Sequence, residues 1–226
     1  MSFLDRIGWI FVSPSKVFAD IREGRVSWWQ PYIVVAAMYT VLGVIGLPIQ
    51  RAVAALNAGN LSPEDLDRQL EIMAKFGLVQ VLGTPVVLLA IGALVAGLTY
   101  IVVTLLSPQA SFKKYFTITM FASIVAGVGQ VLSTIVVRGR GVDAIRSQND
   151  AMAFANLRFL APPDSKVLEG ALSTIEPFSL WSLALVGMGV AHVFGMTRGR
   201  AVAVVVPWWL IYVATSILGA VVAGIS

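Results

Sequence analysis

The chain has 226 residues, of which 58% are hydrophobic and 12% charged, and its formal net charge is +4. Soluble domains carry about 25% charged and about 45–50% apolar residues. The composition therefore excludes an ordinary soluble globular protein and predicts an integral membrane protein. The sequence holds no cysteine, which excludes disulfides, thiolate catalysis and cysteine-ligated metals.

The N-terminal segment, residues 1–27, predicts a short amphipathic helix at the membrane interface. Ser13 and Pro14 form an N-cap and first-turn pair, and Val17, Phe18 and Ile21 fall on one face of the helix that follows. The apolar start of the segment is interrupted by charged residues and lacks a small-x-small cleavage site, so we do not expect a cleaved signal peptide.

Five apolar stretches are long enough to cross the hydrocarbon core, which takes about 20 helical residues. They cover residues 28–49, 77–106, 115–137, 178–196 and 201–225. The predicted fold is an all-α, polytopic membrane bundle of five transmembrane helices, with residues 28–226 forming the membrane domain.

Two further Ser-Pro pairs predict helix starts between the spans. Asp65 follows Ser62 by three residues as a variant capping box, which predicts a helix that runs directly into the second span. The pair at Ser107 precedes a basic-aromatic segment that we expect at the cytosolic interface. The segment contains Phe112, Lys113 and Lys114. We expect Phe18 of the N-terminal segment at the same interface.

The long loop over residues 138–176 contains the stretch MAFANLRFLAPP. This stretch is compatible with a helix that packs against the outer surface of the bundle and equally with a solvated connector. The sequence leaves both interpretations open.

The distribution of charge predicts an orientation. Eight basic and three acidic residues lie in the N-terminal segment and in the loops after the second and fourth spans, whereas the other two loops hold eight basic and nine acidic residues. Because cytoplasmic loops carry an excess of Lys and Arg, we expect a cytosolic N-terminus and a C-terminus on the far side of the membrane.

Small residues recur every four positions in the last two spans, at Gly187, Ala191 and Gly195 and again at Ser216, Ala220 and Gly224. Such faces let helices approach closely in lipid. They predict helix packing within the bundle, or alternatively a surface for another subunit or a partner.

His192 is the only histidine of the chain, and it lies about one turn from the predicted inner end of its span. A proton relay needs acidic groups nearby, and no Asp or Glu lies within the five spans, so a structural role is favoured. A small transporter would instead gather the polar and aromatic residues of the spans around one water-filled cavity. The candidates for such a cavity are Gln80, Gln130, His192, Trp208 and Trp209.

Sequence motifs for catalysis are absent. The chain contains neither H-E-x-x-H nor G-x-S-x-G, and no Walker or dinucleotide glycine pattern outside the spans. We expect no enzymatic activity, no cofactor and no metal site. The basic residues flank the spans and do not form a nucleic-acid patch, so nucleic acid is not an expected partner.

Three stretches resemble the Ypt-interacting protein (Yip) family of five-span membrane proteins, in its prokaryotic form. They are SPSKVFADIRE at residues 13–23, SFKKYFTITMFASIV at residues 111–125, and FSLWSLALVGMGVAHVFGMTRGRAVAVVVPWWLI at residues 178–211. The last stretch is the most specific, with a Phe-Ser-x-Trp opening, a span with glycines, a short basic turn and an apolar run to Pro-Trp. Together with the number of spans, the resemblance covers nearly the whole chain.

The resemblance implies a helical membrane domain with a cytosolic N-terminus, placed in the cytoplasmic membrane of a prokaryote. Eukaryotic members associate with prenylated Rab-type GTPases and act in vesicle traffic. Since only about 27 residues precede the first span here, we do not expect GTPase binding.

Two functions follow as alternatives. The first is a non-enzymatic scaffold or adaptor that binds membrane lipids, other membrane proteins or further copies of the same chain. The second is a small transporter, channel or lipid-handling protein. The two differ in whether Gln80, Gln130 and His192 share one cavity or make separate contacts.

Overall fold

The computed structural model describes residues 2–57, 62–145, 156–162 and 164–225. Five of its helices are long and apolar enough to cross a membrane, as the sequence predicted. They are α3 (Trp29–Asn57), α4 (Pro63–Leu106), α5 (Phe112–Arg140), α7 (Pro177–Phe194) and α8 (Arg198–Ile225). The shorter elements are α1 (Phe3–Val12), α2 (Pro14–Arg22), α6 (Lys166–Ser173) and the 3₁₀ turns η1 (Val142–Ala144) and η2 (Leu157–Leu160).

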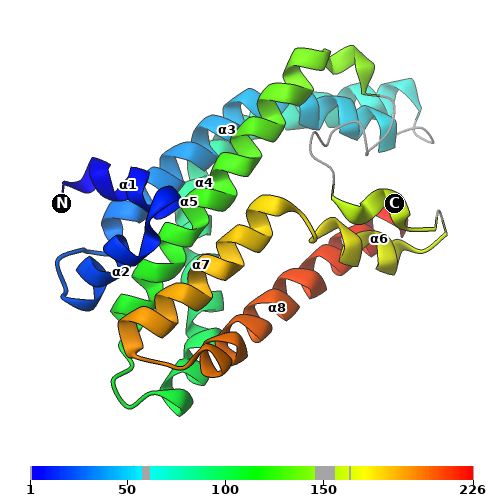
Figure 1. Cartoon of the computed structure of the whole chain (residues 1–226). Coiled ribbons are helices and arrows are strands. Elements are labelled where there is room, and N and C mark those ends of the chain that lie inside the picture. Colours follow the sequence, from blue (N-terminus) through cyan, green and yellow to red (C-terminus); the bar gives the residue numbers. More distant parts are fainter. Residues whose placement is uncertain (1, 58–61, 146–155, 163, 226) are drawn as a thin grey trace.

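The bundle has two distinct ends (Figure 1). One end carries α1, α2 and the turns that join α4 to α5 and α7 to α8, and we call it the N-terminal end. The opposite end, which we call the loop end, carries α6 and the last turns of α3, α5 and α8.

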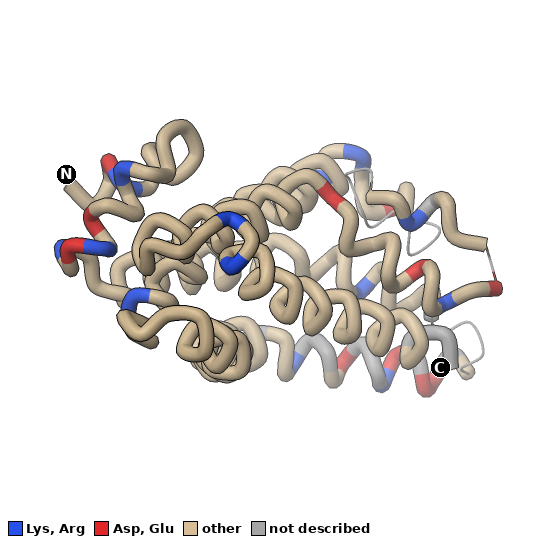
Figure 2. Tube along the Cα trace, turned by 60° about the horizontal axis from the view of Figure 1, so that its bottom comes forward, with Lys and Arg blue, Asp and Glu red and all other residues tan. Residues whose placement is uncertain are grey.

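Most charged residues lie toward the two ends of the bundle, and the long helices between carry few (Figure 2). On α4 alone, Leu82, Val86, Leu94, Leu98 and Leu105 are 52–79% exposed. A soluble protein does not expose so continuous an apolar surface, whereas hydrocarbon around a membrane protein covers it.

Helix α5 forms the centre of the bundle. Tyr115, Ile118 and Phe121 are fully buried, and the Tyr115 hydroxyl donates a hydrogen bond to Thr99 Oγ1 of α4 at 2.8 Å. Gly129 lies so close to α7 that a Cβ there would stand 2.6 Å from Cγ of Phe178. Close packing at a glycine, rather than a polar cavity, therefore joins α5 to α7.

The N-terminal helices are part of this core and do not only lie along the membrane surface. Phe18 of α2 is 1% exposed, and a Cβ added at Gly189 of α7 would lie 3.0 Å from Cε1 of Phe18 and 2.5 Å from Cγ2 of Ile118. Helix α1 was not predicted from the sequence, although Ser2 and Asp5 form a capping box at its start.

A buried ion pair joins α1 to α2. Arg6 Nε donates to Asp20 Oδ2 at 2.8 Å, and the two side chains are 8% and 5% exposed. Arg25 Nη2 lies 3.2 Å from the other carboxylate oxygen of Asp20. Asp20 thereby ties both short helices and the segment before α3 together.

The predicted helix starts were right at two Ser-Pro pairs and wrong at the third. Pro14 begins α2, and Ser62 accepts a hydrogen bond from the Asp65 N–H at the start of the 44-residue α4, which continues into the span. Ser107 instead caps the C-terminus of α4, and α5 begins after Ser111. The residues between form a turn because α4 already ends at Leu106.

The described part of the long loop packs against the bundle. Helix α6 lies on α8, and a Cβ at Gly170 would stand 2.5 Å from Cα of Ile217 and 2.8 Å from the Ser216 carbonyl oxygen. A glycine is required here because the atoms nearest to such a Cβ belong to the backbone of α8, which cannot move aside as a flexible side chain can. Residues 152–155 of the stretch MAFANLRFLAPP lie outside the described residues; its later part forms η2, which contacts α6.

Replacing Asp20 with alanine is expected to lower the free energy of unfolding by about 3–5 kcal/mol, because it leaves the Arg6 guanidinium buried without its anion. Thermal unfolding in mild detergent measures the change. The control is Glu23→Ala, which removes the same charge from a side chain that is 56% exposed and is expected to change stability by only about 0.5 kcal/mol. Equal melting of the two variants would contradict the role assigned to the ion pair.

Candidate functional site

A pocket of about 780 Å³ lies between α2, α7 and α8 at the N-terminal end of the bundle. Its walls are mostly apolar, with Phe18 from α2, Leu183 from α7 and Val205 from α8 among them. This volume and this lining are in the range of pockets that bind small organic ligands. We take this pocket as the candidate functional site.

The polar groups of the pocket gather at one end of it. His192 lies in the last turn of α7, Arg198 is the first residue of α8, and Ser15 lies in the first turn of α2. Leu183 lies nine residues before His192, or about 14 Å deeper along the helix at 1.5 Å per residue. The pocket is therefore polar at its rim and apolar in its deeper part.

The sequence produces this rim through a tight turn. Gly195 adopts φ = +64°, a left-handed conformation that glycine favours, and the Met196 N–H donates to the Ala191 carbonyl oxygen at 3.1 Å. The chain then reverses and α8 begins within a few residues. His192 and Arg198 therefore come from two helices but face the same pocket.

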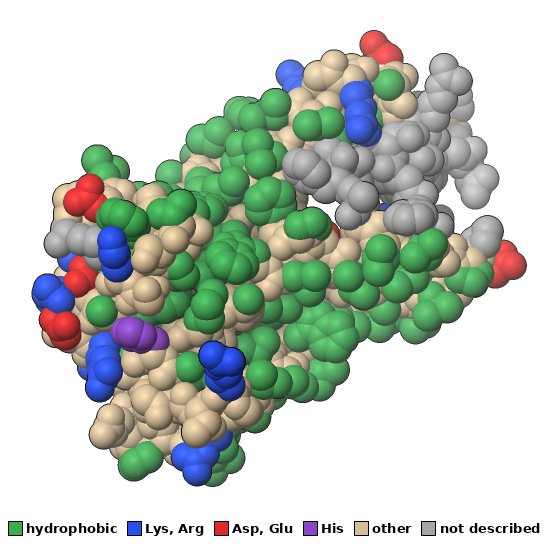
Figure 3. Space-filling model, viewed as in Figure 1, with side chains coloured by type: hydrophobic (Ala, Val, Ile, Leu, Met, Phe, Trp, Pro, Cys, Tyr) green, Lys and Arg blue, Asp and Glu red, His purple; other side chains and the backbone are tan. Residues whose placement is uncertain are grey.

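The charge at the rim is positive and uncompensated. No Asp or Glu lines the pocket, and no ion pair joins Arg198 to any residue that the structure describes. Figure 3 shows the histidine at the end of the molecule where both basic and acidic side chains lie, while apolar side chains cover the middle of the molecule. Such a rim attracts an anionic group.

The residues predicted for a single polar cavity do not meet. Gln80 lines a separate pocket of about 210 Å³ between α3 and α4, and Gln130 is exposed on α5. His192 lines the pocket at the N-terminal end, and neither Trp208 nor Trp209, both half-buried on α8, lines it. These five residues therefore do not form one cavity in the described part of the chain.

The predicted small-residue faces have several different roles. Gly187 and Ala191 line the pocket, and Gly187 also approaches α8, where its Cβ would lie 3.2 Å from Val205 Cγ2. Gly195 does not pack against another helix: it is exposed and serves the turn.

On α8, the backbone at Ser216 contacts α6, so this part of the small-residue face packs against a helix of the same chain. Ala220 is half-buried one turn further on, and the surroundings of Gly224 lie outside the description of the structure.

The basic-aromatic residues divide into buried and exposed members. Phe18 is in the core, as described above, and Lys114 Nζ donates to the Arg22 carbonyl oxygen at 2.7 Å. Phe112 is 39% exposed and stacks on Phe116 with a centroid distance of 5.7 Å. Lys113 is exposed, so it and Phe112 remain accessible at the N-terminal end.

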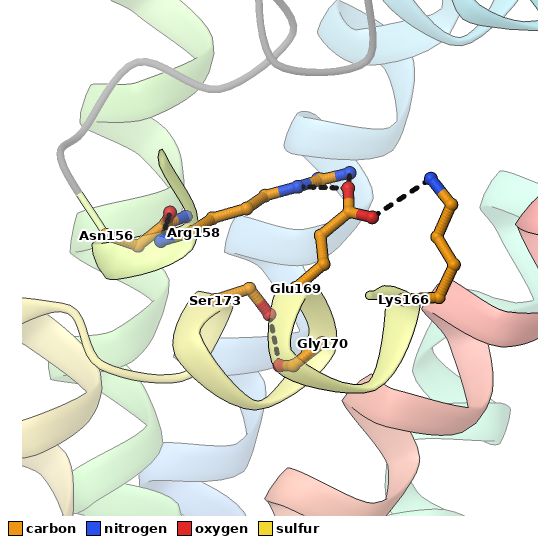
Figure 4. Close-up of polar contacts among 6 residues, drawn as sticks. All are labelled: Asn156, Arg158, Lys166, Glu169, Gly170 and Ser173. Carbon is orange, nitrogen blue, oxygen red and sulfur yellow. Dashed lines mark hydrogen bonds and ion pairs between the residues drawn. The ribbon is translucent and has the colours of Figure 1, made fainter. Parts of the chain in front are cut away.

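A second polar cluster lies at the loop end (Figure 4). Glu169 of α6 accepts a hydrogen bond from Arg158 Nε at 2.7 Å and another from Lys166 Nζ at 3.1 Å. Burial by itself raises the pKa of Glu169, but the hydrogen bonds and charges of Lys166 and Arg158 outweigh it, so the pKa is lowered from its ordinary value of 4.5. The cluster ties η2 to α6 and is structural.

No pattern in the sequence predicts that Arg198, Ser15 and Phe18 line a common pocket. Each lies in a different element, and only packing of α2 against α7 and α8 brings them together. The one feature of the sequence that could have indicated the pocket is the basic turn at residues 196–200, which directly follows Gly195 at the end of α7. Among the described residues, no group of three or more His, Asp or Glu side chains is placed to hold a metal ion.

The comparisons with known proteins agree with this architecture. The family model of the Yip1 domain matches residues 9–219. Membrane protein YknW of Bacillus subtilis (strain 168) is 25% identical to the chain over 192 residues, which cover 84% of this chain and 78% of that protein. No solved structure gives a significant match.

Acidification is expected to loosen α6. Because folding lowers the pKa of Glu169, the cluster stabilises the fold fully above the ordinary pKa of 4.5, and this contribution is lost as the pH falls through the lower pKa of the folded state. Hydrogen exchange of residues 166–173, corrected for intrinsic rates, should show a loss of protection between about pH 5 and pH 3.

The variant Glu169→Gln is expected to lose about 1–3 kcal/mol of this protection already at neutral pH and to respond less to acid. Glu64→Gln, at an exposed position of α4, serves as the control. Unchanged protection of α6 in Glu169→Gln would show that the cluster does not hold the helix.

Proposed function

The chain belongs to the Yip1 domain family, and from that premise we propose that it is a non-enzymatic membrane scaffold or adaptor that binds other membrane proteins or lipids. It is a membrane protein with five candidate spans, as its bacterial relative is a membrane protein by name. No enzymatic activity, nucleic-acid binding or GTPase binding forms part of the proposal.

One observation supports the scaffold over the transporter: Gln80, Gln130 and His192 lie apart. A transport site requires polar groups that converge on the substrate near the middle of the membrane. Here the centre of the bundle is filled by buried α5 side chains such as Ile118, Phe121 and Ile124. A bundle with a filled centre suits a protein that presents surfaces to partners.

The surface best suited to a protein partner is the exposed part of the basic-aromatic segment at the start of α5. Phe112 is held between Tyr100, at a centroid distance of 5.4 Å, and Phe116. Beside it Lys113 is exposed. An aromatic ring that is partly exposed yet fixed in place loses little entropy when a partner covers it.

We further propose that the N-terminal end faces the cytosol of a prokaryotic cell, with the C-terminus outside. The support is the excess of eight basic over three acidic residues at this end, which the loop end lacks.

Single cysteines test the orientation, since the chain has none of its own. Asp164→Cys at the loop end should react with a membrane-impermeant maleimide in intact cells, whereas Gly199→Cys should react only after permeabilisation. Both positions are exposed, and a Cβ at Gly199 meets no atom within 4 Å. The reverse pattern would overturn the orientation.

Native mass spectrometry of the protein, gently extracted from its own membrane, tests the adaptor function. We expect a second protein in fixed stoichiometry, and a loss of at least about five-fold in its occupancy on Lys113→Glu, because a charge at the edge of an interface is reversed. Arg140→Glu, at the other end of the same helix and also exposed, should leave the complex intact. If no second protein is found, or if both variants act alike, the proposed binding of other membrane proteins fails.

A further inference from the structure

The pocket between α2, α7 and α8 has the shape and charge of a site for one amphipathic anion. Its rim carries Arg198 and His192, and its depth is lined by Leu183 and Val205. On α8, Val205 lies seven residues beyond Arg198, or about 10 Å further along the helix. A ligand that fills the pocket must therefore have a charged head and an apolar tail.

The pocket is continuous with the surface that faces hydrocarbon. Met188 of α7 and Val202 of α8 line it, and they are 39% and 59% exposed. An apolar tail can enter sideways between these helices from the surrounding leaflet, without passing through water. This access favours a membrane lipid over a soluble anion.

The head-binding groups match a phosphate. The guanidinium of Arg198 offers several N–H donors in a planar fork, which suits phosphate oxygens, and it has no ion-pair partner among the described residues. Two helices, α2 and α8, begin at the rim with Pro14 and Arg198, and the positive ends of their dipoles add to the same field. No carboxylate opposes the anion in this pocket.

We propose that this pocket binds one anionic phospholipid, with the headgroup phosphate at Arg198 and His192 and an acyl chain between α7 and α8. The proposal rests on the proposed function, since it names the lipid class and the site through which a membrane adaptor of this kind would engage its bilayer. In this proposal, the bound lipid fills the space that remains between α2, α7 and α8.

Native mass spectrometry with added lipid tests the site. The purified protein is titrated with phosphatidylglycerol, which is anionic, and with phosphatidylcholine, which is zwitterionic. We expect one phosphatidylglycerol bound in preference to phosphatidylcholine, and a loss of about ten-fold in its affinity on Arg198→Gln. Arg200→Gln removes the same charge two residues further on, from a side chain that is exposed and does not line the pocket, and should leave the affinity nearly unchanged.

A second variant tests the apolar depth without a change of charge. Ala191→Leu adds bulk inside the pocket and should also displace the lipid. Soluble glycerol 3-phosphate, added in excess, should not compete, because it lacks the chain. Thermal unfolding verifies that each variant is folded.

Several results would overturn the proposal. These are equal effects of Arg198→Gln and Arg200→Gln, equal binding of the two lipids, full lipid affinity in Ala191→Leu, or competition by the soluble headgroup. The same spectra report protein partners separately. A protein partner retained without site-specific lipid would refute the lipid site alone, and a bound lipid without any protein partner would refute the binding of other membrane proteins alone.

Discussion

Close packing at a few glycines determines how the helices of this bundle meet. Inside a bilayer, apolar side chains gain little from leaving lipid for protein, so helix association depends on contact distance and on a few polar bonds. Gly129 receives Phe178, Gly189 receives Phe18 and Ile118, and Gly170 lies on the backbone of α8. At each of these positions a Cβ would stand closer than 3.0 Å to a neighbouring atom, so a larger residue there would push the helices apart.

The contact at Gly189 also explains how the candidate site arises. It lets Phe18 pack fully into the core, which brings α2 against α7. The ion pair between Arg6 and Asp20 then fixes α1 on α2. With α2 held in this place, its first turn closes one side of a pocket that α7 and α8 alone would leave open. The N-terminal helices thus pack into the core of the bundle.

The two ends of the bundle differ in what holds them. At the N-terminal end, buried aromatic residues and the ion pairs of Asp20 hold the helices together, and the surface carries an excess of basic residues. At the loop end, α6 is attached to α8 by a glycine contact and to η2 by the bonds of Glu169 with Arg158. The face around Ser216 is covered by this attachment, whereas Lys113, Phe112 and Arg198 remain accessible at the N-terminal end.

The resemblance of three sequence stretches indicated the family. Hydropathy and charge, read from the sequence alone, determined the number of spans, the all-α class and the excess of basic over acidic residues at one end. These features follow from local composition, because each span must satisfy its own backbone hydrogen bonds and match the thickness of the bilayer. The predicted position of His192 near a helix end was also correct, since it depends only on the turn at Gly195, which directly follows the last residue of α7, Phe194.

Only the tertiary structure decided which small residues pack against which partner, that Phe18 is buried, and that Gln80, Gln130 and His192 lie apart. Periodicity places a residue on a helix face, but the direction of that face depends on its neighbours. The pocket joins residues 14–18, 183–192 and 198–205, so it exists only once α2 has packed against α7 and α8.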